Sequence, residues 1–117
     1  FYSGRSSLCE SYSGRGPSPY AVKKPDVVAP GTDIISCNVG CRSSFRGYRN
    51  AYVKKSGTSM ATPIVSGAAA LLLQKNPEFS NEQVKRKINY SATDLREPWT
   101  KQGWGMVNVG KLIKIVY

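Results

Sequence analysis

The chain has 117 residues, carries 17 lysines and arginines against 7 aspartates and glutamates, and contains no histidine. The missing imidazole excludes a self-contained Ser-His-Asp or Cys-His site, a histidine-ligated metal and a histidine pH switch. The length fits one domain of ordinary size, and the longest apolar stretch, Ala68 to Leu73, is far too short to cross a membrane. We expect a soluble, globular chain with few core residues and no membrane partner.

The cysteines are an odd set of three, Cys9, Cys37 and Cys41, with no Cys-x-x-Cys pair. Without a histidine to complete a ligand set, they predict no metal site. A disulfide between Cys37 and Cys41 stays open, although free thiols are the expected state of so few cysteines.

Loop composition dominates residues 1–20, which are rich in serine, glycine and proline. The run 26–31 then joins β-branched residues to a Pro-Gly turn, which is typical of a strand buried in a parallel sheet. Ile34 and Ile35 predict a second short strand. Residues 37–55 turn polar, basic and aromatic, and we interpret them as a long excursion that ends in an extended piece near Tyr52.

The strongest helix prediction covers residues 59–76. Thr58 or Ser59 can cap its start, and Pro77 stops it. Residues 64–73 are apolar or small on every face, so we expect this helix to be buried all round. The rest of the chain is too short to cover it, which indicates that the sequence belongs to a larger domain or buries this surface in an assembly.

A second, amphipathic helix follows at once. Ser80 and Gln83 have the spacing of a capping box, and Val84 and Ile88 form one apolar stripe. Beyond it the sequence predicts turns at Gly103 and Gly105 and a brief strand at Met106–Val107. Asn108 can then cap a final helix that carries Leu112, Ile113 and Val116.

Ser59 is the residue best placed for chemistry. At a helix start its backbone N–H is unpaired, the helix dipole adds about half a positive charge, and Gly57 two residues earlier leaves room for a substrate. Such a site stabilises an oxyanion. A plain helix cap is the alternative, because serine and threonine cap helices in most proteins.

Four segments resemble the subtilisin-like serine proteases, in the family's chain order. Residues 57–63, Gly-Thr-Ser-Met-Ala-Thr-Pro, with the small and apolar residues that follow, are similar to the helix that bears the family's serine. Residues 12–17, 24–31 and 103–108 are similar to its Phe-Ser-Ser-Arg-Gly-Pro loop, to the next strand and turn, and to its closing motif. The resemblance implies an α/β fold: the C-terminal portion of a parallel-sheet, three-layer domain, incomplete in residues 1–117.

The same resemblance assigns roles. Ser59 becomes the nucleophile with its own N–H as an oxyanion donor, supported by Gly57 and Thr58, and the substrate becomes a polypeptide. The family's order of Asp, His and Ser places the missing His and Asp, and the oxyanion Asn, upstream of Phe1. We expect this chain alone to be inactive and to need no cofactor, with structural calcium left open for the complete domain and secretion weakly favoured.

Asp26 and Asp94 are the acids that could be mistaken for the catalytic aspartate. Both follow the position where the family's aspartate belongs, and Asp26 fits a structural carboxylate at a strand end. Ile64 stands where many members carry a histidine that is not the catalytic base, so it does not affect the assignment.

Three alternatives remain. In the first, the parent protein is an active endopeptidase. In the second, it is a pseudo-protease or regulatory relative that lacks the base. In the third, it is a basic nucleic-acid-binding module centred on residues 42–55. A solvated loop is the simplest interpretation of that last segment, so nucleic acid is not the expected partner. Because the segment is close to Ser59 in the sequence, its cations would favour acidic residues on the leaving-group side of a substrate. The exposed core also predicts a homo-oligomer of the isolated chain.

Overall fold

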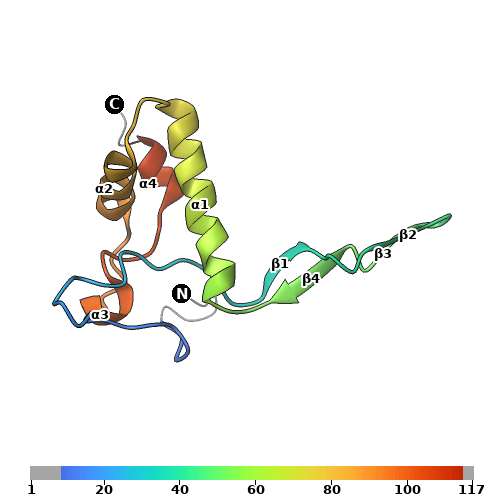
Figure 1. Cartoon of the computed structure of the whole chain (residues 1–117), viewed down its shortest axis with the longest axis horizontal. Coiled ribbons are helices and arrows are strands. Elements are labelled where there is room, and N and C mark those ends of the chain that lie inside the picture. Colours follow the sequence, from blue (N-terminus) through green and yellow to red (C-terminus); the bar gives the residue numbers. More distant parts are fainter. Residues whose placement is uncertain (1–8, 115–117) are drawn as a thin grey trace.

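A computed structural model describes residues 9–114. It forms a helical body from which a narrow two-stranded ribbon projects, and its extents are 54 × 36 × 25 Å (Figure 1). In chain order the elements are β1 (Ile34–Cys37), β2 (Arg42–Ser44), β3 (Gly47–Arg49), β4 (Tyr52–Lys55), α1 (Thr58–Lys75), α2 (Asn81–Ser91), α3 (Trp99–Gln102) and α4 (Val109–Lys114).

The core lies where α1, α2 and α4 meet. Leu72 of α1 and Leu112 of α4 are completely buried, and Ala68, Val84 and Ile88 pack with them. Ala68 and Leu72 are four residues apart, so they share one face of α1. The helix ends at Asn76 as predicted, and the Asn76 N–H donates to the carbonyl of Leu72.

The capping box predicted for α2 is confirmed. The Gln83 N–H donates to Ser80 Oγ at 3.3 Å, and the Ser80 N–H donates to Gln83 Oε1 at 2.8 Å. Val84 and Ile88 are the buried stripe of this helix. Two helix N–H groups that would otherwise lack acceptors are thereby satisfied, which fixes where α2 begins.

Val28 and Met106 form a parallel bridge. The Val28 N–H donates to the Gly105 carbonyl at 2.9 Å, and the Val107 N–H donates to the Val28 carbonyl at 2.9 Å. The strands expected at 26–31 and at Met106–Val107 are therefore reduced to isolated bridges, and Met106 also pairs antiparallel with Thr93. Gly105, with a φ of 120°, makes the predicted turn.

The excursion at 37–55 is a ribbon and not an irregular loop. β1 pairs antiparallel with β4, and β2 pairs antiparallel with β3 at the tip. The extended pieces predicted at Ile34–Ile35 and near Tyr52 are confirmed as β1 and β4. In Figure 1 the ribbon leaves the body at the start of α1 and points away from the other helices.

α1 is buried on one face only, which corrects the expectation of a helix buried all round. Leu71 and Leu73 are exposed by 46% and 37%, and the small residues Ser66, Gly67 and Ala70 are exposed as well. The described residues place α2 and α4 against one side of α1 and leave the other side open.

Asn108 caps α4 as predicted, since its Oδ1 accepts the Lys111 N–H at 2.9 Å, whereas Val116 lies outside the described residues. Cys37 and Cys41 are free and exposed, and Cys9 is free and buried. Within residues 9–114 no helix combines the length and apolar character that crossing a membrane requires.

Replacing Leu72 with alanine should lower the free energy of unfolding by about 2–5 kcal/mol, because it empties a fully buried site in the core. The neighbouring Leu71→Ala change is the matched control, and we expect it to cost less than about 1 kcal/mol since Leu71 faces solvent. Urea denaturation of both variants measures the difference. Equal costs would show that the open face of α1 is covered in solution.

Candidate active site

Ser59 lies in the first turn of α1, exposed at the point where the ribbon returns to the body. Its hydroxyl and its backbone N–H have no hydrogen-bond partner within residues 9–114. The residue preceding the helix is Gly57, and no side chain caps the helix start. The predicted cap by Thr58 or Ser59 is therefore wrong. Both residues lie inside the helix, so the Ser59 hydroxyl is available for other chemistry.

Gly57 sets the direction in which α1 leaves the ribbon. Its φ of 148° is a conformation that L side chains rarely adopt. Its N–H donates to the Gly31 carbonyl at 2.8 Å, and its carbonyl accepts the Met60 N–H at 3.0 Å. A Cβ atom on Gly57 would lie 3.9 Å from the Ser59 nitrogen. Glycine thus keeps the approach to the Ser59 N–H open.

Hydroxyl groups on either side tie the first turn to its surroundings. Ser56 Oγ accepts the Asp33 N–H at 2.9 Å, which joins the two ends of the ribbon. Thr62 Oγ1 donates to the Thr58 carbonyl at 3.0 Å. Pro63 has no N–H to donate to the Ser59 carbonyl four residues earlier. The first turn is therefore held by contacts with the ribbon root as well as by helix bonds.

A groove of about 360 Å³ runs beside the first two turns of α1. Ile34 of β1 and Val53 of β4 line one side, and Met60 and Ile64 of α1 line the other. The sequence predicts extended pieces at Ile34 and near Tyr52 but does not join them to the helix. The signal that could have found the groove is the apolar residue on each side of the polar excursion.

Asp26 serves a structural role, as predicted. Lys24 Nζ lies 2.6 Å and Lys85 Nζ lies 3.3 Å from its carboxylate oxygens. Partial burial opposes ionisation, but the hydrogen bonds and charges of the two lysines outweigh it and hold the pKa of Asp26 below its ordinary value. Both carboxylate oxygens are thus engaged away from Ser59.

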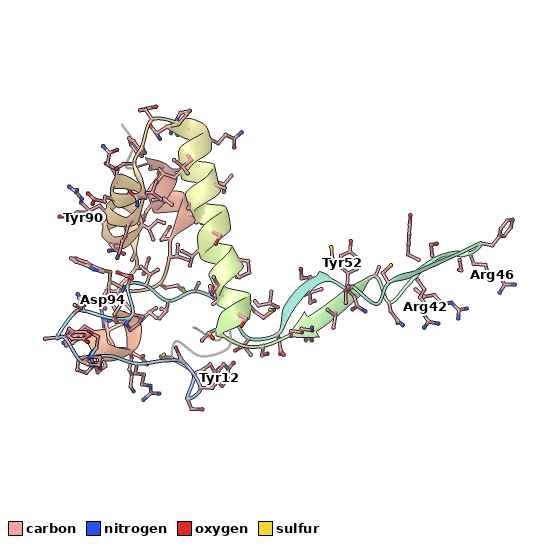
Figure 2. All side chains as sticks on the ribbon, in the orientation of Figure 1. Tyr12, Arg42, Arg46, Tyr52, Tyr90 and Asp94 are labelled. Atoms are coloured by element: carbon pink, nitrogen blue, oxygen red, sulfur yellow. The ribbon has the colours of Figure 1, made fainter. Side chains whose placement is uncertain are left out.

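The carboxylate of Asp94 is also engaged in hydrogen bonds. Its Oδ1 accepts the Arg96 N–H and the Gln102 Nε2–H, each at 2.8 Å. The Arg96 backbone bond and then the Gln102 bond lower the pKa of Asp94, despite a small opposing effect of desolvation. The label in Figure 2 places Asp94 beside α3, on the side of the body away from the ribbon.

The structure places Gly57, Thr58 and Ser59 at one helix start, and within residues 9–114 no acidic or basic side chain forms a hydrogen bond with any of them. Over the described stretch 9–114 no three histidine, cysteine, aspartate or glutamate side chains gather as metal ligands would. The roles assigned to the three residues stay predictions. What the arrangement offers chemically is an uncommitted hydroxyl and an uncommitted N–H at the helix start, with a groove lined by Met60, Pro63 and Ile64 along the same two turns.

Gly57→Ala should destabilise the chain by about 1–2 kcal/mol, because alanine must adopt a strained positive φ. Gly67→Ala is the matched control. Gly67 lies inside α1, where an added Cβ meets no atom within 4 Å, so this change should stabilise the chain by up to about 1 kcal/mol through helix propensity. Thermal or urea unfolding measures both changes. A stabilising Gly57→Ala would contradict the strained helix start.

The ion pairs of Asp26 predict a pH dependence. Because its pKa is lowered in the folded state, the stabilisation is present above the unfolded pKa of about 4 and is lost as the pH falls through the folded pKa. Between about pH 7 and about pH 3 the free energy of unfolding of wild type should fall more than that of Asp26→Asn. Asp33→Asn, at an exposed site, should follow wild type. Parallel profiles for wild type and Asp26→Asn would refute this.

A sequence model described as the subtilase family matches residues 4–105. The serine protease AprX of Bacillus subtilis (strain 168) is 44% identical over 83 residues, which are 67% of this chain and 19% of that protein. Subtilisin BL of Lederbergia lenta is 44% identical over 78 residues, 67% of this chain and 28% of that protein. The chain therefore spans less than a third of each relative.

Solved structures agree. The prenylagaramide maturation protease PagA superposes with a TM-score of 0.61 and 33% identity, covering 83% of this chain and 35% of that one. Fervidolysin of Fervidobacterium pennivorans, a keratinolytic enzyme related to subtilisin, superposes with a TM-score of 0.60 and 28% identity, covering 73% of this chain and 14% of that one. The predicted fold class, a part of the subtilisin-like α/β fold, is confirmed. Fold, sequence model and relatives agree that the chain belongs to the subtilase family.

Proposed function

We propose that this chain carries the nucleophilic serine of a serine endopeptidase and forms the C-terminal part of its catalytic domain. The observation that carries the proposal is Ser59, whose hydroxyl and N–H are both uncommitted within the described residues, in a first helix turn whose next residue, Met60, lines a groove. The serine proteases among the relatives support it.

The chemistry is nucleophilic acyl transfer to a peptide carbonyl. Ser59 Oγ attacks the carbonyl carbon and loses its proton to a histidine supplied from outside these 117 residues, since the chain has none. The carbonyl oxygen becomes an oxyanion, which accepts a hydrogen bond from the Ser59 N–H and a second from an asparagine of the same outside segment. The protonated histidine then gives its proton to the departing amine, and water releases the acyl group by the reverse sequence.

The open face of α1 gives the outside segment a place to pack. Leu71 is the large apolar residue of this face and is 46% exposed, whereas Leu73 borders a pocket lined by Val84 and Ile88 of α2. Burying the exposed part of Leu71 would stabilise the assembled domain by about 1 kcal/mol. In the isolated chain a second copy can cover the same face, which is the origin of the homo-oligomer we expect.

A pseudo-protease would share every feature described for Ser59 and lack only the base. The two proposals differ in one test, which is whether Ser59 becomes reactive once the rest of the domain is present.

The chain alone should not react measurably with a fluorophosphonate probe, because serine without its base is a poor nucleophile. In subtilisin, removing the serine or the histidine lowers turnover by about 10⁶-fold. Combined with a segment that supplies the family's Asp, His and Asn, the chain should label at Ser59, as located by mass spectrometry.

Ser59→Ala should abolish labelling in the combined protein and leave its circular dichroism unchanged. The matched control is Ser66→Ala, an exposed serine two turns along α1, which should label like wild type. Labelling at another residue would remove the proposal, and an unreactive Ser59 in a folded, complete domain would favour the pseudo-protease.

A further inference from the structure

The ribbon carries charge that nothing in the described chain neutralises. No acid occurs between Asp33 and Glu78, and none of the ion pairs described involves a ribbon residue. The cations fall into two groups: two lysines at the root, Lys54 and Lys55, and three arginines toward the tip, Arg42, Arg46 and Arg49.

The pairing of β2 and β3 sets like charges against each other. Arg42 lies directly opposite Arg49 in the antiparallel register, so both side chains leave the same face of the tip. Arg46 lies in the turn between the strands, and Figure 2 shows Arg42 and Arg46 extending from the distal part of the ribbon. Like charges directly opposite each other destabilise a strand pair, so folding alone does not explain them.

Aromatic side chains accompany the arginines without packing into a core. Phe45, in the turn, is fully exposed and Tyr48 is 77% exposed. Every residue from 41 to 50 is exposed. Arginine and aromatic residues are the types that dominate the binding energy of protein interfaces. The tip therefore has the composition of a binding surface.

Two further observations favour an acidic polypeptide over other anions. All three tip cations are arginines, whose planar guanidinium binds carboxylates through paired hydrogen bonds. The ribbon has only two strands at each level, so its outer edges are open to an added strand of polypeptide, a mode of binding that needs a peptide backbone. Nucleic acid shares the charge requirement but cannot pair with these edges.

The ribbon is long compared with the reach of its charges. From Arg46 to Ser56 the chain covers ten residues, or about 33 Å at the rise of a strand, whereas charge interactions are screened within about 8 Å at physiological salt. The tip arginines therefore cannot act on residues beside a bond cut at Ser59. Only Lys54 and Lys55 remain close enough for the steering effect predicted from the sequence.

We propose that the ribbon tip, with Arg42, Arg46, Arg49, Phe45 and Tyr48, is an exosite that holds an acidic, extended segment of a polypeptide substrate. This inference rests on the proposed function for the identity of the partner as a substrate. An extended polypeptide needs about ten residues to span the ribbon. The acidic segment thus lies about ten residues from the bond that Ser59 cuts.

The first test measures binding without catalysis. The probe is a fluorescein-labelled peptide of about ten residues, half of them Asp or Glu, titrated by anisotropy into the full Ser59→Ala chain. Arg42→Gln/Arg46→Gln/Arg49→Gln should weaken binding by at least about 10-fold. A charge-matched control with Arg86→Gln/Lys111→Gln/Lys114→Gln, all exposed residues of α2 and α4, should bind like the parent.

Competition separates the polypeptide from nucleic acid. The Gln and Asn analogue of the peptide should bind at least about 10-fold more weakly than the acidic peptide. A single-stranded oligonucleotide of equal charge should compete less well than the acidic peptide. An oligonucleotide that binds more tightly, or equal binding by the triple tip variant and the control, would overturn the exosite.

The second test measures spacing in the complete, active protein. Substrates with an acidic cluster about ten residues from the cleaved bond should show a higher kcat/KM than substrates with the cluster about three residues away, and the tip variant should remove that advantage. Cleavage of a neutral substrate should not change in the tip variant. If the acidic peptide binds but Ser59 fails to label, the proposed function fails while the binding surface stands.

Discussion

One hydrogen bond, from the Gly57 N–H to the Gly31 carbonyl at 2.8 Å, organises the site. It joins the turn after the Val28 bridge to the residue before α1, so the body, the ribbon and the helix start meet at a single point. Gly57 accepts this position because its φ of 148° suits glycine. The position of Ser59 relative to the groove follows from that junction.

The two faces of α1 differ in how they are packed. Ala68 and Leu72 pack into a small core with α2 and α4, which is sufficient to define the helix and its direction. Leu71, one residue away, faces solvent. A helix that is apolar all round but covered on one side indicates a second body that is not among the described residues. Under the proposed function, the same body brings the base to Ser59.

Local signals in the sequence predicted local structure well. The Ser80 and Gln83 pair located α2 because both partners of a capping box lie within four residues. Pro77 likewise ended α1. The cap at Thr58 or Ser59 was predicted wrongly, because α1 begins at Thr58 and the residue before it, Gly57, has no side chain that could accept from the first turn.

Features that need distant partners could not be predicted in the same way. Val28 has the composition of a strand but makes one bridge, since strand pairing depends on neighbours that a sequence pattern does not specify. The excursion at 37–55 was read as a loop because its residues are polar on both faces, and a free ribbon has no buried face to impose alternation. The motif and the helix start single out Ser59 in the sequence, whereas the groove beside α1 can be identified only once the fold is known.

The closed junction at Gly31 and Gly57 also bears on how this region can change during evolution. Everything between the two glycines leaves the body and returns to the same point, so residues added at the tip, between Phe45 and Arg46, lengthen the ribbon without displacing either end. Doubling the length of such a closed segment costs only about 0.6 kcal/mol in loop entropy. The tip is therefore a position where new recognition sequences can be inserted, by selection or by design, while the helix start keeps its geometry.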